Sequence, residues 1–260
     1  EWSMSNDDVS IKALHHPAGG TWSSIATLST GSYPGSYLMP QPQVAMDGQG
    51  NALAVWLHTS ATNTTYHIVA SRYTASTAAW APAAAIETLP EDALYPRLAM
   101  NAAGDAVVVW RNQMNASEIG VYANRFSPSS GWLASTELVS QQTVTASNPF
   151  LVLLAEVDCA VNDAGESIVV YGDYDATGGL VYAKRHTQAS GWSAAQKIHT
   201  LAGITLFPRV AMDAGGNAVA LWGQTAGAVI DMASDNYVAG QGWSTAPSPG
   251  RQRSCQTPCL

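Results

Sequence analysis

One twelve-residue pattern occurs four times in this chain and sets the spacing of everything around it. The copies are AMDGQGNALAVW at 45–56, AMNAAGDAVVVW at 99–110, AVNDAGESIVVY at 160–171 and AMDAGGNAVALW at 211–222. Each reads as an apolar strand, a tight turn that begins with Asp or Asn and ends with Gly, and a second apolar strand. Because internal repeats of this length mark repeat architectures, the pattern predicts one assembly of similar units.

A second marker, mostly Gly-Trp, follows each copy and also precedes the first one. Its tryptophans are Trp22, Trp80, Trp132, Trp192 and Trp243. Between the two markers lies a segment of alternating character, such as VYANRF at 121–126. Each unit is therefore predicted to be a four-stranded antiparallel meander.

A single meander cannot bury both of its faces, so the units must stack on one another. Radial stacking predicts an all-β fold, a β-propeller of about five blades in which four repeats are full and the N-terminal one is partial. We expect one propeller domain over 1–247, with a partial blade at 1–30 and blades at about 42–89, 95–140, 156–200 and 207–247, followed by a tail at 248–260. Either this tail closes a five-bladed ring irregularly, or the natural protein continues upstream and has more blades.

The charge pattern argues against two classes of partner. The chain has 11 basic residues, a net charge of -8 and no basic block, whereas nucleic acids and anionic membranes require clustered Lys and Arg. No apolar run approaches the roughly 20 residues of a membrane span. No signal peptide is visible, and the first residue is Glu, so we expect a mature or trimmed product.

The cysteines indicate an oxidising compartment. Cys255 and Cys259 are predicted to form a small disulfide loop in the tail, and Cys159 is expected to be a buried residue of a repeat strand. With only 12% of residues charged, the chain has the composition of a secreted, strand-rich protein. We therefore expect a secreted, periplasmic or cell-surface location.

The repeat unit P-x-V-A-M-D-x-x-G-N-A-x-A-V-W, followed by A-x-R-Y and G-W, resembles the tandem repeats of about 50 residues of secreted or surface-attached bacterial proteins. These are similar in architecture to sialidase-type (Asp-box) propellers. The resemblance implies a propeller fold, in a group that includes glycosidases, lectins and uncharacterised surface proteins. The Asp of an Asp-box is replaced here, and neither the arginine triad nor the Tyr and Glu pair of a sialidase can be placed. The replaced positions are Pro17, Ala75, Ser127, Thr187 and Val238.

Candidate ligand-binding residues are sought where the repeat changes. Tyr171 replaces the Trp found at this position in the other copies. It is followed by two carboxylates and a second aromatic residue, Asp173, Asp175 and Tyr174. Asp173 and Asp175 are the candidate catalytic pair, since glycoside cleavage uses two carboxyl groups, although a solvated loop is the favoured interpretation of these residues. Arg97 and Arg209, which follow Pro in the first strand of their units, are expected to line the central channel.

Other polar residues recur at one repeat position, which favours a structural role. The turn residues Asp47, Asn101, Asn162, Asp163 and Asp213 are expected to cap turns; calcium binding is the alternative. Arg72, Arg125 and Arg185 are expected to hydrogen-bond between blades; one sugar or anion site per blade junction is the alternative. No metal site and no cofactor are predicted.

These observations favour a non-catalytic extracellular binding module for glycans or a surface protein partner. A sialidase-like glycoside hydrolase is the first alternative. The second is a structural component of a surface assembly, in which another chain completes the partial blade or the protein self-associates through it.

Overall fold

The computed structural model describes residues 8–32, 40–60, 63–115, 118–143, 156–175, 178–199, 203–226, 229–244 and 248–249. These residues form four five-stranded sheets and one two-stranded sheet. Neighbouring strands within each sheet pair antiparallel. Across these ranges no helix occurs that is long and apolar enough to cross a membrane. The all-β, multi-bladed fold predicted from the repeats is confirmed.

Each five-stranded sheet is one blade and has the same strand order. The first strands are β3 (Gln43–Met46), β8 (Ala93–Met100), β13 (Val157–Val161) and β18 (Thr205–Met212). The second strands are β4 (Ala52–Ser60), β9 (Ala106–Asn115), β14 (Ser167–Asp175) and β19 (Ala218–Ala226). The third strands are β5 (Asn63–Thr74), β10 (Glu118–Ser127), β15 (Gly178–Thr187) and β20 (Val229–Val238).

The predicted fourth strand is divided into two pieces in every blade, and both pieces pair with the third strand. The pieces are β6 (Ala79–Trp80) with β7 (Ala84–Ala85), β11 (Gly131–Trp132) with β12 (Glu137–Thr143), β16 (Gly191–Trp192) with β17 (Gln196–Lys197), and β21 (Gly242–Trp243) with β22 (Ser248–Pro249). The partial N-terminal unit is the two-stranded sheet of β1 (Asp8–Ala13) and β2 (Ala26–Ser32).

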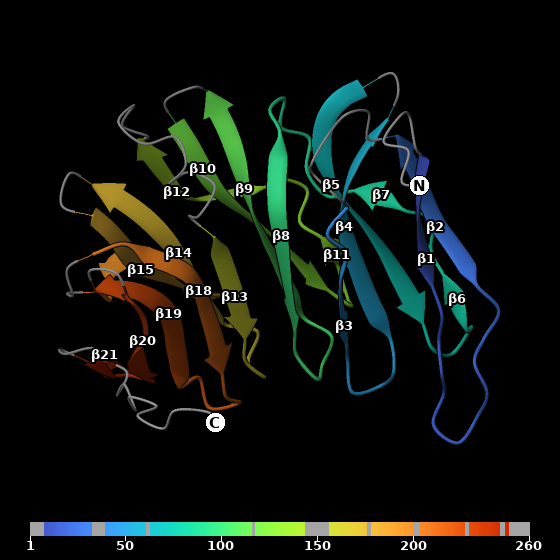
Figure 1. Cartoon of the computed structure of the whole chain (residues 1–260). Coiled ribbons are helices and arrows are strands. Elements are labelled where there is room, and N and C mark those ends of the chain that lie inside the picture. The colour runs from blue at the N-terminus through green and yellow to red at the C-terminus, as the bar shows by residue number, and fades with distance from the viewer. Residues whose placement is uncertain are drawn as a thin grey trace, which may run out of the picture.

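The blades follow one another in chain order, from β1 and β2 at one end to β18–β21 at the other (Figure 1). The first strands β3, β8, β13 and β18 lie next to one another along the middle of the molecule (Figure 1), and neighbouring first strands are in contact. Side chains from different repeats can therefore meet on these strands. The domain boundaries proposed from the sequence, including the tail at 248–260, stay predictions.

The turn between the first and second strands explains why the same residue pattern recurs in each repeat. In the second blade, the Asn101 side-chain oxygen accepts a hydrogen bond of 2.9 Å from the Asp105 N–H, and Gly104 has a φ of +94°. Asp47 caps the corresponding turn of the first blade, where its carboxylate accepts from the N–H groups of Gln49 and Asn51 at 2.9 and 2.8 Å. These contacts support the turn-capping interpretation.

Replacing Gly104 by Ala is expected to lower the free energy of unfolding by about 1–3 kcal/mol. Its φ of +94° is strained for any residue with a Cβ, and an added Cβ would lie 2.8 Å from Pro128 Cγ. Urea unfolding would measure the loss, with Ala103→Ser in the same turn as the control. Equal stability of Gly104→Ala and the parent would contradict the left-handed turn.

The core lies between blades. Val107 and Val109 of β9, both 0% exposed, pack on Val157, Cys159 and other apolar residues of the third blade. Burial raises the pKa of the Cys159 thiol well above its ordinary value, as expected for the predicted core residue. Each interior blade therefore buries apolar side chains against its neighbours.

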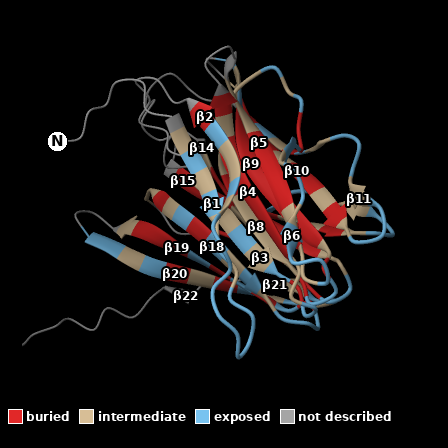
Figure 2. Ribbon diagram, turned by 90° about the vertical axis from the view of Figure 1, so that its right-hand side faces the viewer, coloured by how far each residue is buried: buried red, intermediate tan, exposed pale blue. Residues whose placement is uncertain are grey.

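The last blade differs because it has no following blade among the described residues. Val219 and Leu221, which occupy the repeat positions of Val107 and Val109, are 43% and 44% exposed. Figure 2 shows the same contrast: buried residues dominate β9 and β10, whereas buried and exposed residues alternate along β19. The burial of a repeat residue is thus decided by the position of its blade.

Candidate active site

The third blade breaks the repeat on its first strand. In the second and fourth blades this strand carries an aromatic residue, Pro and Arg in succession, as Tyr95-Pro96-Arg97 and 207–209. The third blade has Glu156-Val157-Asp158 in the same place. We call Glu156 and Asp158 the carboxylate pair. They lie on the strand between the two that carry Arg97 and Arg209.

The structure brings both arginines onto one carboxylate. Arg97 Nη2 lies 3.0 Å from Glu156 Oε2, and Arg209 Nη2 lies 2.6 Å from the same oxygen. Each guanidinium also donates from Nη1 to the carbonyl of its own preceding Pro, at 3.2 Å for Arg97 and 2.9 Å for Arg209. The two arginines therefore have matching conformations and converge on Glu156 from opposite neighbouring blades.

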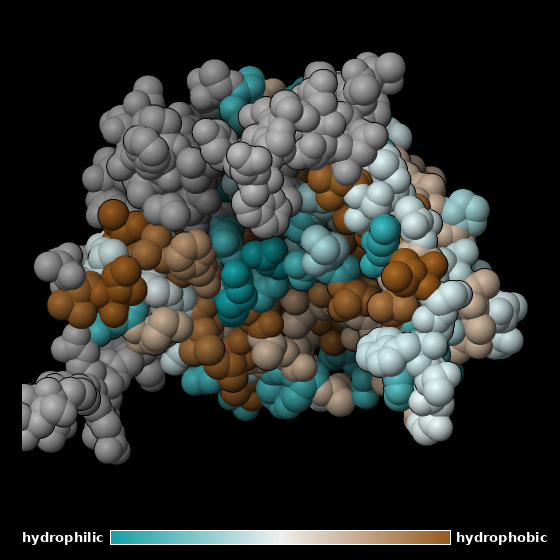
Figure 3. Space-filling model, turned by 45° about the vertical axis from the view of Figure 1, so that its right-hand side comes forward, coloured by the Kyte–Doolittle hydropathy of each residue, from teal (hydrophilic) through white to brown (hydrophobic). Residues whose placement is uncertain are grey.

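This cluster is partly open to solvent. The side chains of Glu156 and Arg97 are 17% and 18% exposed, and that of Arg209 is 44% exposed. On the face seen in Figure 3, hydrophilic side chains gather in the middle with hydrophobic ones on both sides. The charged groups of the first strands are accessible enough to meet a ligand and buried enough to interact strongly.

Asp158 has a different environment from Glu156. Its Oδ2 accepts a hydrogen bond of 3.0 Å from the Val210 N–H of β18. Burial raises the pKa of the Asp158 carboxyl above its ordinary value of 3.8. Hydrogen bonds from the N–H groups of Val210 and Cys159 and the charges of Arg209 and Arg97 oppose this rise in pKa but do not cancel it. Asp158 therefore keeps its proton to a higher pH than an ordinary Asp.

The carboxylate pair has the contrast in environment that acid–base chemistry requires. Glu156 directly precedes β13 and Asp158 is its second residue, so in an extended chain their side chains share one face and their Cα atoms are roughly 6.6 Å apart. Glycoside cleavage uses two carboxyl groups about 5–9.5 Å apart, one protonated and one ionised. Burial raises the pKa of Asp158, whereas Glu156 forms ion pairs with two guanidinium groups, so the two carboxyl groups differ in environment.

The sequence-predicted cluster at 171–175 adjoins this site without forming it. Tyr171 is 2% exposed and its ring stacks on Tyr182 with centroids 5.9 Å apart, so it belongs to the core. Gly172 donates its N–H to the Glu156 carbonyl at 3.2 Å, which places β14 alongside the carboxylate pair. Asp173 is half-buried. Burial raises the pKa of the Tyr171 phenol, and the charge of Asp173 adds to this rise.

Several predicted residues are not placed by the structure. The side chains of Tyr174 and Asp175 and the predicted disulfide of Cys255 and Cys259 lie outside the described residues. Arg97 and Arg209 are brought together, and their ligand-binding role stays a prediction. Glu156 and Asp158 were missed, although aligning the residues before each repeated turn would have revealed them as the exception to the aromatic-Pro-Arg sequence.

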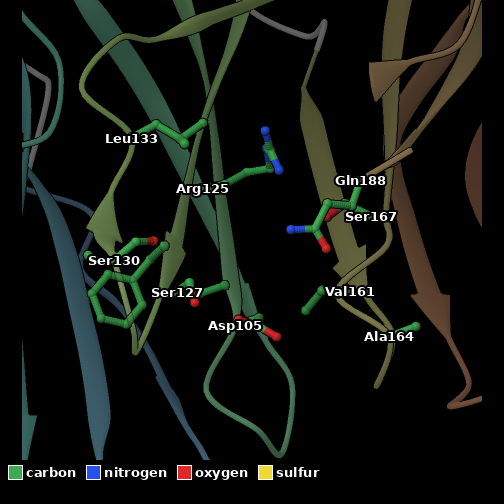
Figure 4. A pocket seen from close by; sticks show the side chains of 13 residues that line it. Asp105, Arg125, Ser127, Ser130, Leu133, Val161, Ala164, Ser167 and Gln188 are labelled. Atoms are coloured by element: carbon green, nitrogen blue, oxygen red, sulfur yellow. The ribbon is translucent and has the colours of Figure 1, made fainter. Parts of the chain in front are cut away.

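A cavity of 160 Å³ lies apart from this cluster, between the second and third blades (Figure 4). Figure 4 shows Asp105, Arg125 and Gln188 pointing into the space between the two blades. Arg125 forms a bidentate ion pair with Glu137 of its own blade, with Nε–Oε2 at 2.9 Å and Nη2–Oε1 at 3.0 Å. Its guanidinium is thus already engaged by a carboxylate.

The other arginines of this repeat position contact the next blade. The Arg72 guanidinium lies 5.3 Å from the centroid of the Phe126 ring, and that of Arg185 lies 5.9 Å from the centroid of the Tyr237 ring. These cation–π contacts cross the blade junctions. The expected hydrogen bonds between blades are not what the structure shows for Arg125 and Arg185, which pair with Glu137 and Glu166 of their own blades. The ring contacts across the junctions still support a structural role over one sugar or anion site per junction.

No protein-family model and no curated protein sequence matches the chain. Solved structures match its fold at low identity. The alpha-L-arabinofuranosidase of Fusarium graminearum is 13% identical, with a TM-score of 0.52 over 76% of this chain and 62% of that one. An ulvan lyase is 10% identical, with a TM-score of 0.51 over 82% and 55% of the two chains. The alpha-L-arabinanase of Penicillium chrysogenum is 11% identical, with a TM-score of 0.51 over 81% and 66%.

These similarities show a shared β-propeller fold, and the chain spans 62% of the arabinofuranosidase it matches. They also correct the functional expectation. The prediction of a non-catalytic binding module was wrong, because the structures that share the fold are named as glycoside hydrolases and a polysaccharide lyase. The alternative prediction, a glycoside hydrolase, agrees better with these neighbours. The expectation had rested on the absence of a recognisable catalytic set in the sequence.

Proposed function

We propose that this chain is a glycoside hydrolase that cleaves a glycan at the first strands of its blades. The observation that carries the proposal is the carboxylate pair at the start of β13, whose Glu156 forms ion pairs with Arg97 and Arg209 of the adjacent blades. The fold similarity to glycan-processing enzymes supports it. A secreted, periplasmic or surface location is proposed with it, since extracellular glycans would be the substrates.

Asp158 acts as the general acid in this proposal. Its raised pKa keeps a proton available, which passes to the glycosidic oxygen as the bond between that oxygen and the anomeric carbon breaks. The protonated oxygen leaves with the departing sugar as a neutral hydroxyl group. No metal ion is required for this step, since the proton neutralises the leaving group.

Glu156 promotes formation of the new bond at the anomeric carbon, whose electron pair comes either from its own carboxylate or from an attacking water. Its ionised carboxylate either attacks the anomeric carbon directly or removes a proton from a water that attacks it. Arg97 and Arg209 orient the carboxylate by donating to its Oε2 atom. The anomeric configuration of the released sugar distinguishes the two routes, because direct attack followed by hydrolysis retains the configuration and attack by water inverts it.

The test is release of reducing ends from soluble polysaccharides, arabinan and ulvan among them. The parent is expected to cleave at least one, and Glu156→Gln is expected to lower kcat by about 100-fold or more, since it removes the charged member of the pair. Glu137→Gln is the matched control, since Glu137 pairs with Arg125 away from the site. Products with an unsaturated sugar end would indicate a lyase instead, and equal rates for Glu156→Gln and the parent would refute the assignment.

A further inference from the structure

The repeat position of Glu156 holds an aromatic residue in both neighbouring blades. Tyr95 precedes Pro96 in β8, and Phe207 precedes Pro208 in β18. Two residues further along each strand is the arginine that contacts Glu156. The carboxylate pair is thus flanked by two strands that each carry an aromatic side chain at the corresponding level.

Both aromatic residues have an unusual backbone. The φ angles of Tyr95 and Phe207 are +58° and +51°, in the left-handed region that bulky residues avoid. A following Pro restricts the backbone further. The pairing register shifts at these residues, between Leu94 and Arg97 and between Leu206 and Arg209, as in a β-bulge.

The bulge itself does not require an aromatic side chain. Gln41 occupies the same repeat position in the first blade, with a φ of +47° and a following Pro. Backbone strain of this kind persists where the surrounding structure imposes it and gathers at functional sites. The aromatic character of Tyr95 and Phe207 therefore calls for an explanation other than the backbone conformation.

Phe207 is 47% exposed, and hydrogen bonds place its strand beside the carboxylate pair. Arg209 contacts Glu156, and the Val210 N–H donates to Asp158. The last blade also exposes Val219, Leu221, Ile230 and Met232, so exposure alone does not distinguish Phe207. Its position does, because it lies two residues before Arg209 on the strand that contacts both carboxyl groups, and it has a positive φ that the other four lack.

We propose that Phe207 and Tyr95 are sugar-binding residues whose rings stack on the apolar faces of two sugar units, one on each side of the carboxylate pair. An oligosaccharide would then lie across β18, β13 and β8, with the bond to be cleaved at Glu156 and Asp158. The substrate class is a glycan chain with sugar units on both sides of that bond, and a single sugar with a small leaving group is a poor substrate. This inference rests on the proposed hydrolase function. Aromatic rings beside a few fixed polar groups are the usual composition of a small-ligand site.

Phe207→Gly provides the test, since Gly accepts the left-handed backbone and removes only the ring. Affinity electrophoresis in gels containing arabinan, ulvan or other soluble polysaccharides measures binding without turnover. We expect at least one polysaccharide to slow the migration of the parent protein. Phe207→Gly should bind that polysaccharide at least tenfold more weakly, and Phe207→Trp should bind it almost as well as the parent does. Leu221→Ala, on the same exposed blade, is the matched control and should bind as the parent does. The melting temperature of Phe207→Gly should not fall below that of the parent.

Each outcome decides the inference. It is overturned if the gels retard Phe207→Gly as strongly as the parent, or if Leu221→Ala weakens polysaccharide binding as much as Phe207→Gly does. It is also overturned if Phe207→Gly has a lower melting temperature than the parent, or if no gel retards the parent. The proposed function fails separately: retardation that depends on Phe207, with no cleavage of the retained polymer, would refute the hydrolase but not the sugar contact. Cleavage that Glu156→Gln abolishes, with a KM unaffected by Phe207→Gly, would refute the contact alone.

Discussion

Asp158→Asn is expected to lower kcat by about 100- to 10,000-fold, the range that a positioned general acid contributes. The amide has no proton to give to the leaving oxygen at any pH, while its carbonyl can still accept the hydrogen bond from the Val210 N–H. The loss should therefore be catalytic rather than structural. Initial rates on the best polysaccharide from the reducing-end assay would measure it.

The pH dependence of the parent gives an independent check on Asp158. Its pKa is raised above 3.8, and the protonated form is the active acid. Activity that depends on this proton is present below the raised pKa and is lost as the pH rises through it. The remaining activity of Asp158→Asn should lack this basic limb.

Stability separates the catalytic role of Asp158 from a structural one. A carboxyl group whose pKa is higher in the folded state than in the unfolded state lowers stability as the pH rises from about 4 through the folded pKa. Asp158→Asn removes this loss, so its melting temperature at neutral pH should equal or exceed that of the parent. Asp213→Asn, at an exposed turn of the last blade, is the control for activity. A stable Asp158→Asn variant with the parent's rate and pH profile would contradict the assignment.

Trp110→Ala is expected to lower the free energy of unfolding by about 3–5 kcal/mol. The side chain is 0% exposed and packs against the first blade, where Val55, Leu57 and Ile68 lie in the same core cluster. Its ring also stacks over Tyr122, with centroids 6.3 Å apart. Because a domain has a net stability of only about 5–15 kcal/mol, urea unfolding should show a large shift of the midpoint.

The third blade itself suggests the matched variant for Trp110. Tyr171 occupies the equivalent position and is buried there, so Trp110→Tyr should keep most of the contact and cost less than Trp110→Ala. Trp22→Ala, at a residue 66% exposed, should change stability by about 0.5 kcal/mol or less. A loss below about 1 kcal/mol for Trp110→Ala would show that the blade junction is not the main core.

The repeats made the blade architecture predictable because each repeat must form the same hairpin. The turn residues Asn101 and Gly104 could be predicted from spacing alone, whereas the ligand-binding role of Arg97 and Arg209 stays a prediction. The candidate catalytic residues were harder to predict, because the most visible change in the repeat is at the end of the second strand, at 171–175. The first strand of the third blade, with Glu156 and Asp158, is changed equally. It was not predicted as a site, because two carboxylates in a strand do not indicate a site until the side chains around them are known.

Local sequence was sufficient for the strands, the turns and the alternation of apolar residues, since these depend on interactions within about 20 residues of the chain. Only the tertiary structure decided that Arg97, Glu156 and Arg209 meet, although Arg97 and Glu156 are 59 residues apart. It also decided that Val107 is buried and the equivalent Val219 is exposed. The reason is the same in both cases: the charge environment and the burial of a side chain depend on the neighbouring blade, and identical repeats have different neighbours.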